Sequence, residues 1–378
     1  MNYNAIESSW IGILGGGQLG RMLALSGYPL GLRFRIFDPS PLAPAGHLAE
    51  HVQGAYDDTA ALDRFVEGLS VVSYEFENVP VQTARHLNQR APVYPPPQAL
   101  ETAQDRLSEK TLFQKLGVET PPFAPLFSLE ELTEAVARVG LPAVLKTRRL
   151  GYDGKGQAVL RTPEDVERAH ALLRGSELIL EGFVPFEREL SILGVRGRDG
   201  ASVFYPLVEN HHRDGILRLS LAPAPGDLRV LQQRAEAICL QVMKALDYVG
   251  VLAIEFFQHN GRLLANEMAP RVHNSGHWSM EGAEVSQFEN HIRAIAGLPL
   301  GSTRVRGCAA MLNLIGELPG LSQPLGEPRA HAHFYGKAPA PGRKVGHINI
   351  VTETADERAD VIRKFANCPG VYDIQPRA

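Results

Sequence analysis

A glycine-rich turn near the start of the chain is the feature that most constrains its fold. Residues 15–20 read Gly-Gly-Gly-Gln-Leu-Gly, follow a strand-like run at 10–14 and open a helical pattern at 18–26. Strand-like runs at 34–37, 71–76 and 93–94 alternate with helical patterns at 58–68 and 81–89. This alternation predicts a parallel α/β sheet in the N-terminal part of the chain.

The same turn is compatible with a dinucleotide-binding site. It contains the GxGxxG pattern, and Asp38 follows Gly20 by 18 residues, near the position of an acidic residue that binds a ribose. A tight turn without a ligand is the alternative. No catalytic pattern of a nicotinamide enzyme follows, and the residues farther along the chain favour a nucleoside triphosphate.

Turn residues and periodicity divide the chain into three predicted domains: 1–105, 106–300 and 301–378. Three prolines at 95–97 precede a predicted helix at 98–116 that ends at Gly117. A small lid is expected at about 123–186, with strands at 143–147, 157–161 and 178–181 and a helix at 163–174. Helices are expected at 228–246 and 283–296. The last domain should form a smaller mixed unit with strands at 311–315, 331–335 and 344–350 and a helix at 355–365.

Composition excludes several classes of function. The 378 residues include 38 basic and 42 acidic side chains, so the net charge of −4 offers no basic excess for nucleic acid. The N-terminus does not resemble a secretory signal, and no apolar run is long enough to span a membrane. Three cysteines far apart, Cys239, Cys308 and Cys368, fit neither a disulfide framework nor a zinc site. We expect a cytoplasmic protein.

A second glycine-rich segment has the composition of a phosphate-binding loop. Residues 151–157 read Gly-Tyr-Asp-Gly-Lys-Gly-Gln and lie between two predicted strands, so their N–H groups could fold over phosphates. The spacing is not that of a Walker P-loop. Lys146, on the preceding strand, could place its ammonium on a phosphate, or it could be a solvated lysine at a strand edge.

Two carboxylates in consecutive apolar strands indicate a metal site. Glu255 and Glu267 would be costly to bury unless a cation neutralised them, and hard oxygen ligands suit Mg²⁺. A two-residue turn at 260–261 would place them on opposite faces of the hairpin. A three-residue loop at 259–261 would place them on one face, and we predict that loop. The alternative is that each carboxylate points to solvent.

A polar segment follows the second carboxylate directly. Residues 268–278 place Arg271, His273, Asn274, Ser275 and His277 in one predicted loop. A loop at the end of a rigid strand is a favoured place for catalysis. Arg271 offers planar donors for bicarbonate or a carboxylate, and His273 could orient or protonate a reacting group.

Segments 15–22, 75–79, 152–157, 266–278 and 342–349 together resemble those of the N5-carboxyaminoimidazole ribonucleotide synthases, in the same order and over nearly the full length. The resemblance implies an α/β ATP-grasp fold of mixed α+β character. It also implies an enzyme of purine synthesis, usually a homodimer, that joins aminoimidazole ribonucleotide and bicarbonate at the expense of ATP with Mg²⁺.

The resemblance also implies roles for individual residues. Arg271, His273 and Lys337 would be catalytic, and Glu255 and Glu267 would bind the metal. ATP would contact Arg106, Lys146, Gly151, Tyr152, Asp153, Gly154, Lys155, Gly156, Gln157, Glu181, Gly182, Phe183, Val184, Glu189, His212, Asn266 and Glu267. The ribonucleotide would contact Gln18, Leu19, Glu75, Tyr152, Asp153, Asn274, Ser275, Lys337 and Arg343.

Several alternatives remain open at this point. Glu189 could form a surface ion pair, and Lys337 and Arg343 could be solvent-facing charges. Leu150 stands where many relatives have glycine, which could change the mobility of the lid. A formate-dependent glycinamide ribonucleotide transformylase shares the ATP-grasp plan, and a nucleotide-binding regulator without catalysis is a third possibility.

Overall fold

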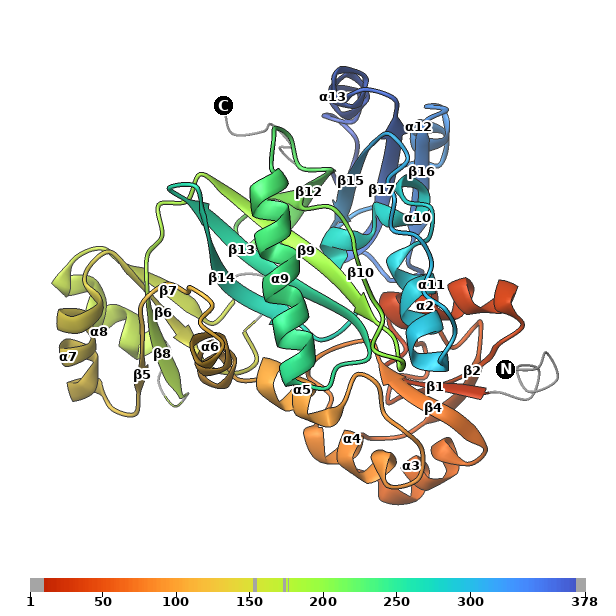
Figure 1. Cartoon of the computed structure of the whole chain (residues 1–378), viewed down its shortest axis with the longest axis horizontal. Coiled ribbons are helices and arrows are strands. Elements are labelled where there is room, and N and C mark those ends of the chain that lie inside the picture. Colours follow the sequence, from red (N-terminus) through yellow and green to blue (C-terminus); the bar gives the residue numbers. More distant parts are fainter. Residues whose placement is uncertain (1–9, 152–154, 173–174, 176, 372–378) are drawn as a thin grey trace.

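The computed structural model describes residues 10–151, 155–172, 175 and 177–371. Its N-terminal part is a four-stranded parallel sheet in the order β3-β2-β1-β4, drawn in red and orange in Figure 1. The predicted parallel sheet is therefore confirmed. Its elements are β1 (Trp10–Leu14), α2 (Gln18–Gly27), η1 (Tyr28–Leu30), β2 (Arg33–Asp38), β3 (Glu50–Gln53), α3 (Thr59–Val66), β4 (Leu69–Tyr74), α4 (Val81–Asn88) and α5 (Pro97–Ala103).

A small antiparallel sheet, with strand order β5-β8-β6-β7, projects from one side of the molecule with helices α7 and α8 against it (Figure 1). This is the region predicted as a lid. Helix α6 leads into it. The elements are α6 (Arg106–Lys115), β5 (Phe123–Leu126), α7 (Leu129–Val139), β6 (Ala143–Thr147), β7 (Gln157–Leu160), α8 (Pro163–Leu172) and β8 (Leu178–Gly182).

A nine-stranded antiparallel sheet forms the centre, with β14-β13-β9-β11-β12-β15-β17-β16 in order and β10 paired to β9. Helix α9 covers one face, and α11 packs between this sheet and α2. The elements of this part are β9 (Arg188–Arg196), β10 (Ser202–Phe204), β11 (Val208–Arg213), β12 (Ile216–Ala222), α9 (Arg229–Ala245), β13 (Gly250–His259), β14 (Arg262–Ala269), η2 (Asn274–Gly276), α10 (Ser279–Gly282) and α11 (Gln287–Ala296).

The C-terminal strands continue this central sheet and do not form a sheet of their own. Strand β15 pairs with β12, with Leu312 opposite Leu219, and β17 and β16 extend the sheet outward. The largest core cluster accordingly joins Ile11 of the N-terminal sheet, Val251 and Phe288 of the central part and Met311 of the C-terminal part. The elements are β15 (Cys308–Ile315), α12 (Ser322–Leu325), β16 (Ala330–Phe334), β17 (Lys344–Thr352) and α13 (Ala355–Lys364).

Several predicted boundaries are wrong for local reasons. The single helix at 98–116 is two helices, because the Asp105 side chain accepts the Leu107 N–H and starts α6 anew. The helix expected from residue 283 begins at Gln287, where Ser286 caps it. Segment 93–94 forms only an isolated bridge to Val72, and strands β3 and β5 were not predicted. No helix among the described residues is long and apolar enough to cross a membrane.

Candidate active site

A cavity of about 430 Å³ lies where the N-terminal sheet, the lid loop, the central sheet and the C-terminal hairpin meet. Its volume suits a nucleotide-sized ligand. Many of the predicted site residues line it together. These are Gln18, Leu19, Glu75, Arg106, Gly151, His212, Glu255, Glu267, Arg271, His273, Asn274 and Lys337.

The first glycine turn is occupied by the protein's own carboxylates. Asp38 accepts the Gly16 N–H at 2.7 Å, and Glu75 accepts the N–H groups of Gly17 at 2.5 Å and Gly20 at 2.7 Å. A dinucleotide would need these same donors for its pyrophosphate. The turn instead fixes Glu75 at the cavity wall. Burial raises the pKa of Glu75, while the two N–H groups and Lys337 oppose that effect.

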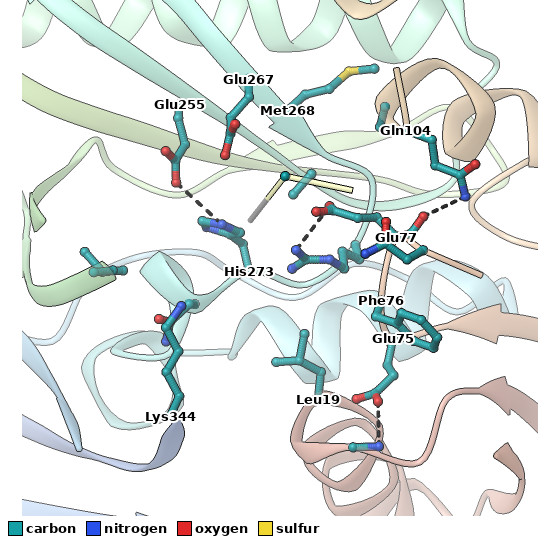
Figure 2. Close-up of a pocket in the computed structure, with 18 of the residues that line it drawn as sticks. Leu19, Glu75, Phe76, Glu77, Gln104, Glu255, Glu267, Met268, His273 and Lys344 are labelled. Atoms are coloured by element: carbon teal, nitrogen blue, oxygen red, sulfur yellow. Dashed lines mark hydrogen bonds and ion pairs between the residues drawn. The ribbon is translucent and has the colours of Figure 1, made fainter. Parts of the chain in front are cut away.

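The predicted three-residue hairpin loop is wrong, but its consequence for the carboxylates is right. His259 pairs with Arg262, so the loop has two residues, Asn260 and Gly261, with φ of 49° and 69°. A bulge at Asn266 then shifts the register, and Glu255 lies directly opposite Glu267. Figure 2 shows both side chains entering the cavity from the strands.

The electrostatics of this pair suit a divalent cation. Burial, with Glu267 nearby, raises the pKa of Glu255 to about 7, although His212 lowers it. Burial would also raise the pKa of Glu267, but Arg106, 2.9 Å away, holds that pKa below its ordinary value. The Asn266 side-chain oxygen is buried beside them without a partner among the described residues. Those residues contain no cluster of three or more metal-binding groups, so Mg²⁺ here would need phosphate oxygens and water as further ligands.

A chain of hydrogen bonds fixes the orientation and tautomer of His273. Asn210 donates to the Ser191 hydroxyl, which donates to the Ser275 hydroxyl, 2.9 Å from the His273 Nδ1. Because Nδ1 also accepts the Ser275 N–H, the proton of a neutral ring belongs on Nε2, which lies 3.5 Å from Glu255. Burial and Arg271 lower the pKa of His273 well below its ordinary value, so the ring is neutral at pH 7.

Cations gather beneath the lid around one buried carboxylate. Glu181 lies 2.9 Å from the Lys146 ammonium and 3.2 Å from that of Lys110. Burial alone would raise the pKa of Glu181, but Lys110, Lys146 and Arg106 lower it to about 2. Lys146 is buried, so the solvated strand-edge alternative is wrong. Glu189 pairs with His212 at 3.1 Å, and no ion pair with Arg188 is found among the described residues.

The remaining predicted residues lie around the cavity or outside it. Tyr152, Asp153 and Gly154 fall outside the described residues. Lys146 and Gln157 are paired across the β6–β7 ladder, and Gly156 has a φ of 71° beside the exposed Lys155. Gly182 is the last residue of β8, Phe183 and Val184 follow it, and Ser275 is buried behind His273.

Arg343 is exposed, donates to the Ala338 carbonyl and is not part of the cavity lining, whereas its neighbour Lys344 is.

Comparison with known proteins decides the family. A family model of the ribonucleotide synthetase preATP-grasp domain matches residues 9–104, the ATP-grasp domain model matches 111–288, and the phosphoribosylaminoimidazole carboxylase C-terminal domain model matches 309–360. The N5-carboxyaminoimidazole ribonucleotide synthase of Pseudomonas aeruginosa is 54% identical over 340 residues, which cover 90% of this chain and 94% of that protein. The chain belongs to the N5-carboxyaminoimidazole ribonucleotide synthase family.

Two solved structures of synthases support this assignment over nearly the whole chain. That from Thermus thermophilus has a TM-score of 0.93 and 60% identity, and covers 97% of this chain and 100% of its own. The synthase from Aspergillus clavatus, in complex with ADP and 5-aminoimidazole ribonucleotide, has a TM-score of 0.88 and 30% identity, and covers 96% and 98%. The ATP-grasp fold inferred from the sequence is thus confirmed.

Several residues of this synthase-family chain that line the cavity or form ion pairs near it were missed from the sequence. Glu77 ion-pairs with Arg271, Lys110 with Glu181, and Lys344 lines the wall beside Lys337. Glu109 accepts the Met268 N–H, and burial together with Glu267 raises its pKa to about 8. The adjacent charges Glu109 and Lys110 within a helix carried no spacing signal. Glu77 did carry a sequence signal, because it lies just after the end of a strand, two residues beyond Glu75.

Proposed function

We propose that the chain is an ATP-dependent ligase that carboxylates 5-aminoimidazole ribonucleotide with bicarbonate, giving N5-carboxyaminoimidazole ribonucleotide, ADP and phosphate in purine biosynthesis. The observation that carries the proposal is the convergence of three groups on one cavity: the braced turn with Glu75, the carboxylate pair, and the loop with Arg271 and His273. Membership of the synthase family supports it.

ATP is proposed to lie between the lid and the β13–β14 hairpin. Lys146 and Arg106 would supply positive charge for its phosphates, and the glycine-rich segment 151–157 is proposed to bind them through its N–H groups. The linker 181–184 would hold the adenine, and Glu189 with His212 the ribose. Mg²⁺ would be held by Glu255 and Glu267, and when bound it neutralises charge on the phosphates.

The ribonucleotide is proposed to lie toward the N-terminal sheet, against Gln18, Leu19 and Glu75. Lys337, close enough to lower the pKa of Glu75, supplies a cation for its phosphate, and Arg343 would assist from outside the present lining. The side-chain amides of Asn274 and Asn313 donate hydrogen bonds to each other. This pair fixes Asn274 on the part of the loop that is proposed to contact the ribonucleotide.

The chemistry follows from these positions. Arg271 holds bicarbonate while a bicarbonate oxygen attacks the γ-phosphate of ATP. This attack gives carboxyphosphate and releases ADP. The substrate amine then attacks the carboxyl carbon of carboxyphosphate, the C–O bond to the phosphoryl group breaks, and phosphate leaves with the proton that the amine loses. Neutral His273, with its proton on Nε2, donates a hydrogen bond and does not act as a cationic acid. The closed lid excludes water, which would otherwise hydrolyse the intermediate.

Phosphate release separates this proposal from the formate-dependent glycinamide ribonucleotide alternative. Release should require bicarbonate plus aminoimidazole ribonucleotide and should not occur with formate plus glycinamide ribonucleotide. No turnover with any substrate pair would instead favour a nucleotide-binding regulator. Arg271→Ala should abolish coupled hydrolysis with little change in ATP binding, and near-normal turnover would contradict its role.

The compartment, the oligomeric state and the domain bounds of the protein are also proposed. The protein would act as a cytoplasmic homodimer, with the domain bounds 1–105, 106–300 and 301–378, and without nucleic acid or membrane partners. Sedimentation at several concentrations tests the dimer.

A further inference from the structure

Arg271 is already bound to a carboxylate of the protein itself. Its Nη2 donates to Glu77 at 3.1 Å, and its Nη1 donates to the Val272 carbonyl at 3.1 Å. The Nε is buried and has no acceptor among the described residues. The pairing with Glu77 is therefore incomplete, because a guanidinium can donate two parallel hydrogen bonds to a planar oxyanion.

Glu77 reaches Arg271 from a different part of the chain. It follows β4, and the Gln104 side chain holds its backbone by donating to the carbonyls of Glu77 at 2.7 Å and Val79 at 2.6 Å (Figure 2). The Glu77 side chain remains 28% exposed, so only its backbone is tightly held. A carboxylate on a fixed backbone with an accessible side chain can leave its partner without disturbing the fold.

The other carboxylates of the cavity are engaged elsewhere. Glu75 accepts the N–H groups of the glycine turn, Glu109 accepts the Met268 N–H, Glu267 pairs with Arg106, and Glu255 lies by His273. Glu77 is thus the carboxylate placed against the cation that the proposed function assigns to bicarbonate. A carboxylate and bicarbonate present the same planar pair of oxygens to a guanidinium.

We propose that Glu77 is a positioning residue that occupies Arg271 as a placeholder until the oxyanion substrate displaces it. Without Glu77, Arg271 would bind any small anion. With Glu77 in place, an anion must displace the Glu77 carboxylate, which favours an anion that accepts hydrogen bonds from both Nε and Nη2. The inference rests on the proposed function for the identity of the anion. The proposal predicts that Glu77 weakens the binding of anions to Arg271. If Glu77 only held Arg271 in place, it would strengthen that binding.

The test compares Glu77→Gln with the wild type. This near-isosteric change removes the competing charge, so the KM for bicarbonate should fall roughly five-fold while the KM for ATP stays the same. Glu50→Gln, which removes an exposed carboxylate from the Arg35–Glu50 pair, is the matched control and should change neither value. An unchanged or higher KM for bicarbonate in Glu77→Gln would overturn the proposal.

A binding measurement keeps this test separate from the proposed reaction. Nitrate is a planar monoanion that cannot attack a phosphate, and it should raise the melting temperature of Glu77→Gln more than that of the wild type or Glu50→Gln. Glu77→Ala should behave like Glu77→Gln. Equal responses to nitrate in all four proteins would overturn the placeholder, whereas absence of bicarbonate-dependent turnover in the wild type would overturn only the proposed function.

Discussion

At the scale of single residues, charge compensation explains most of the site. Three carboxylates of the site have specific partners: Glu75 has backbone N–H groups, Glu181 has two lysines, and Glu267 has Arg106. A buried ion pair costs desolvation free energy, and removing one partner leaves the other charge unpaired. These residues should therefore affect stability as well as ligand binding.

The variant Glu181→Gln should show how the contribution of Glu181 to the free energy of unfolding depends on pH. Since the folded pKa of Glu181 is about 2 against an ordinary 4.5, its stabilisation is fully present above about pH 4.5 and is lost as the pH falls toward 2. The variant should lose roughly 3 kcal/mol of unfolding free energy at pH 7, measured by urea denaturation, and the difference should shrink below pH 4.5.

The exposed pair Arg85–Glu101 provides a control for that measurement. Its residues are 46% and 47% exposed, so Glu101→Gln should cost less than about 1 kcal/mol. A Glu181→Gln difference that stayed constant from pH 7 to pH 3, or that matched the control, would contradict the lowered pKa.

At the scale of elements, the β13–β14 hairpin shows how backbone geometry decides chemistry. The two-residue turn alone would put Glu255 and Glu267 on opposite faces, and the bulge at Asn266 restores them to one face. The pair can be tested by neutralising one member, because Glu267→Gln keeps the backbone and the bulge and removes only the carboxylate opposite Glu255. Turnover should fall to background, and ATP affinity, measured by calorimetry with Mg²⁺, should fall at least ten-fold.

A substitution in the turn of the same hairpin serves as the comparison. Gly261 has a φ of 69° and open space around it, so Gly261→Ala should cost about 1 kcal/mol of stability and leave turnover unchanged. If Glu267→Gln retained turnover, the carboxylates would not act as a pair.

The sequence predicted what local patterns determine. The parallel sheet, the lid strands β6–β7–β8 and the convergence of Arg271 and His273 on one loop followed from periodicity and composition. The bulge at Asn266 could not be predicted from the sequence, because it depends on how β14 pairs with β13. The break at Asp105 could not be predicted either, because Arg148 and Arg149 of the lid loop hold that carboxylate from outside the helix. Lys110 is recognisable only once distant segments are placed together, because its partner Glu181 lies on β8.

At the scale of the whole molecule, the last part of the chain is structurally continuous with the centre. Strand β15 covers the edge of β12, and Leu219 and Leu221 share a core cluster with Leu312, Ile348 and Val361. A chain ending at residue 300 would expose this edge and apolar surface. It should lack cooperative thermal unfolding and should aggregate in size-exclusion chromatography. A monodisperse, cooperatively unfolding fragment would contradict this continuity.

The central claim is that ATP activates bicarbonate at Arg271 for transfer to the substrate amine. Turnover with ¹⁸O-labelled bicarbonate tests it most directly, because attack of a bicarbonate oxygen on the γ-phosphate carries that oxygen into the released phosphate. The account predicts one labelled oxygen per phosphate and equal amounts of phosphate and carboxylated nucleotide. Unlabelled phosphate, or phosphate formed without carboxylated product, would contradict it.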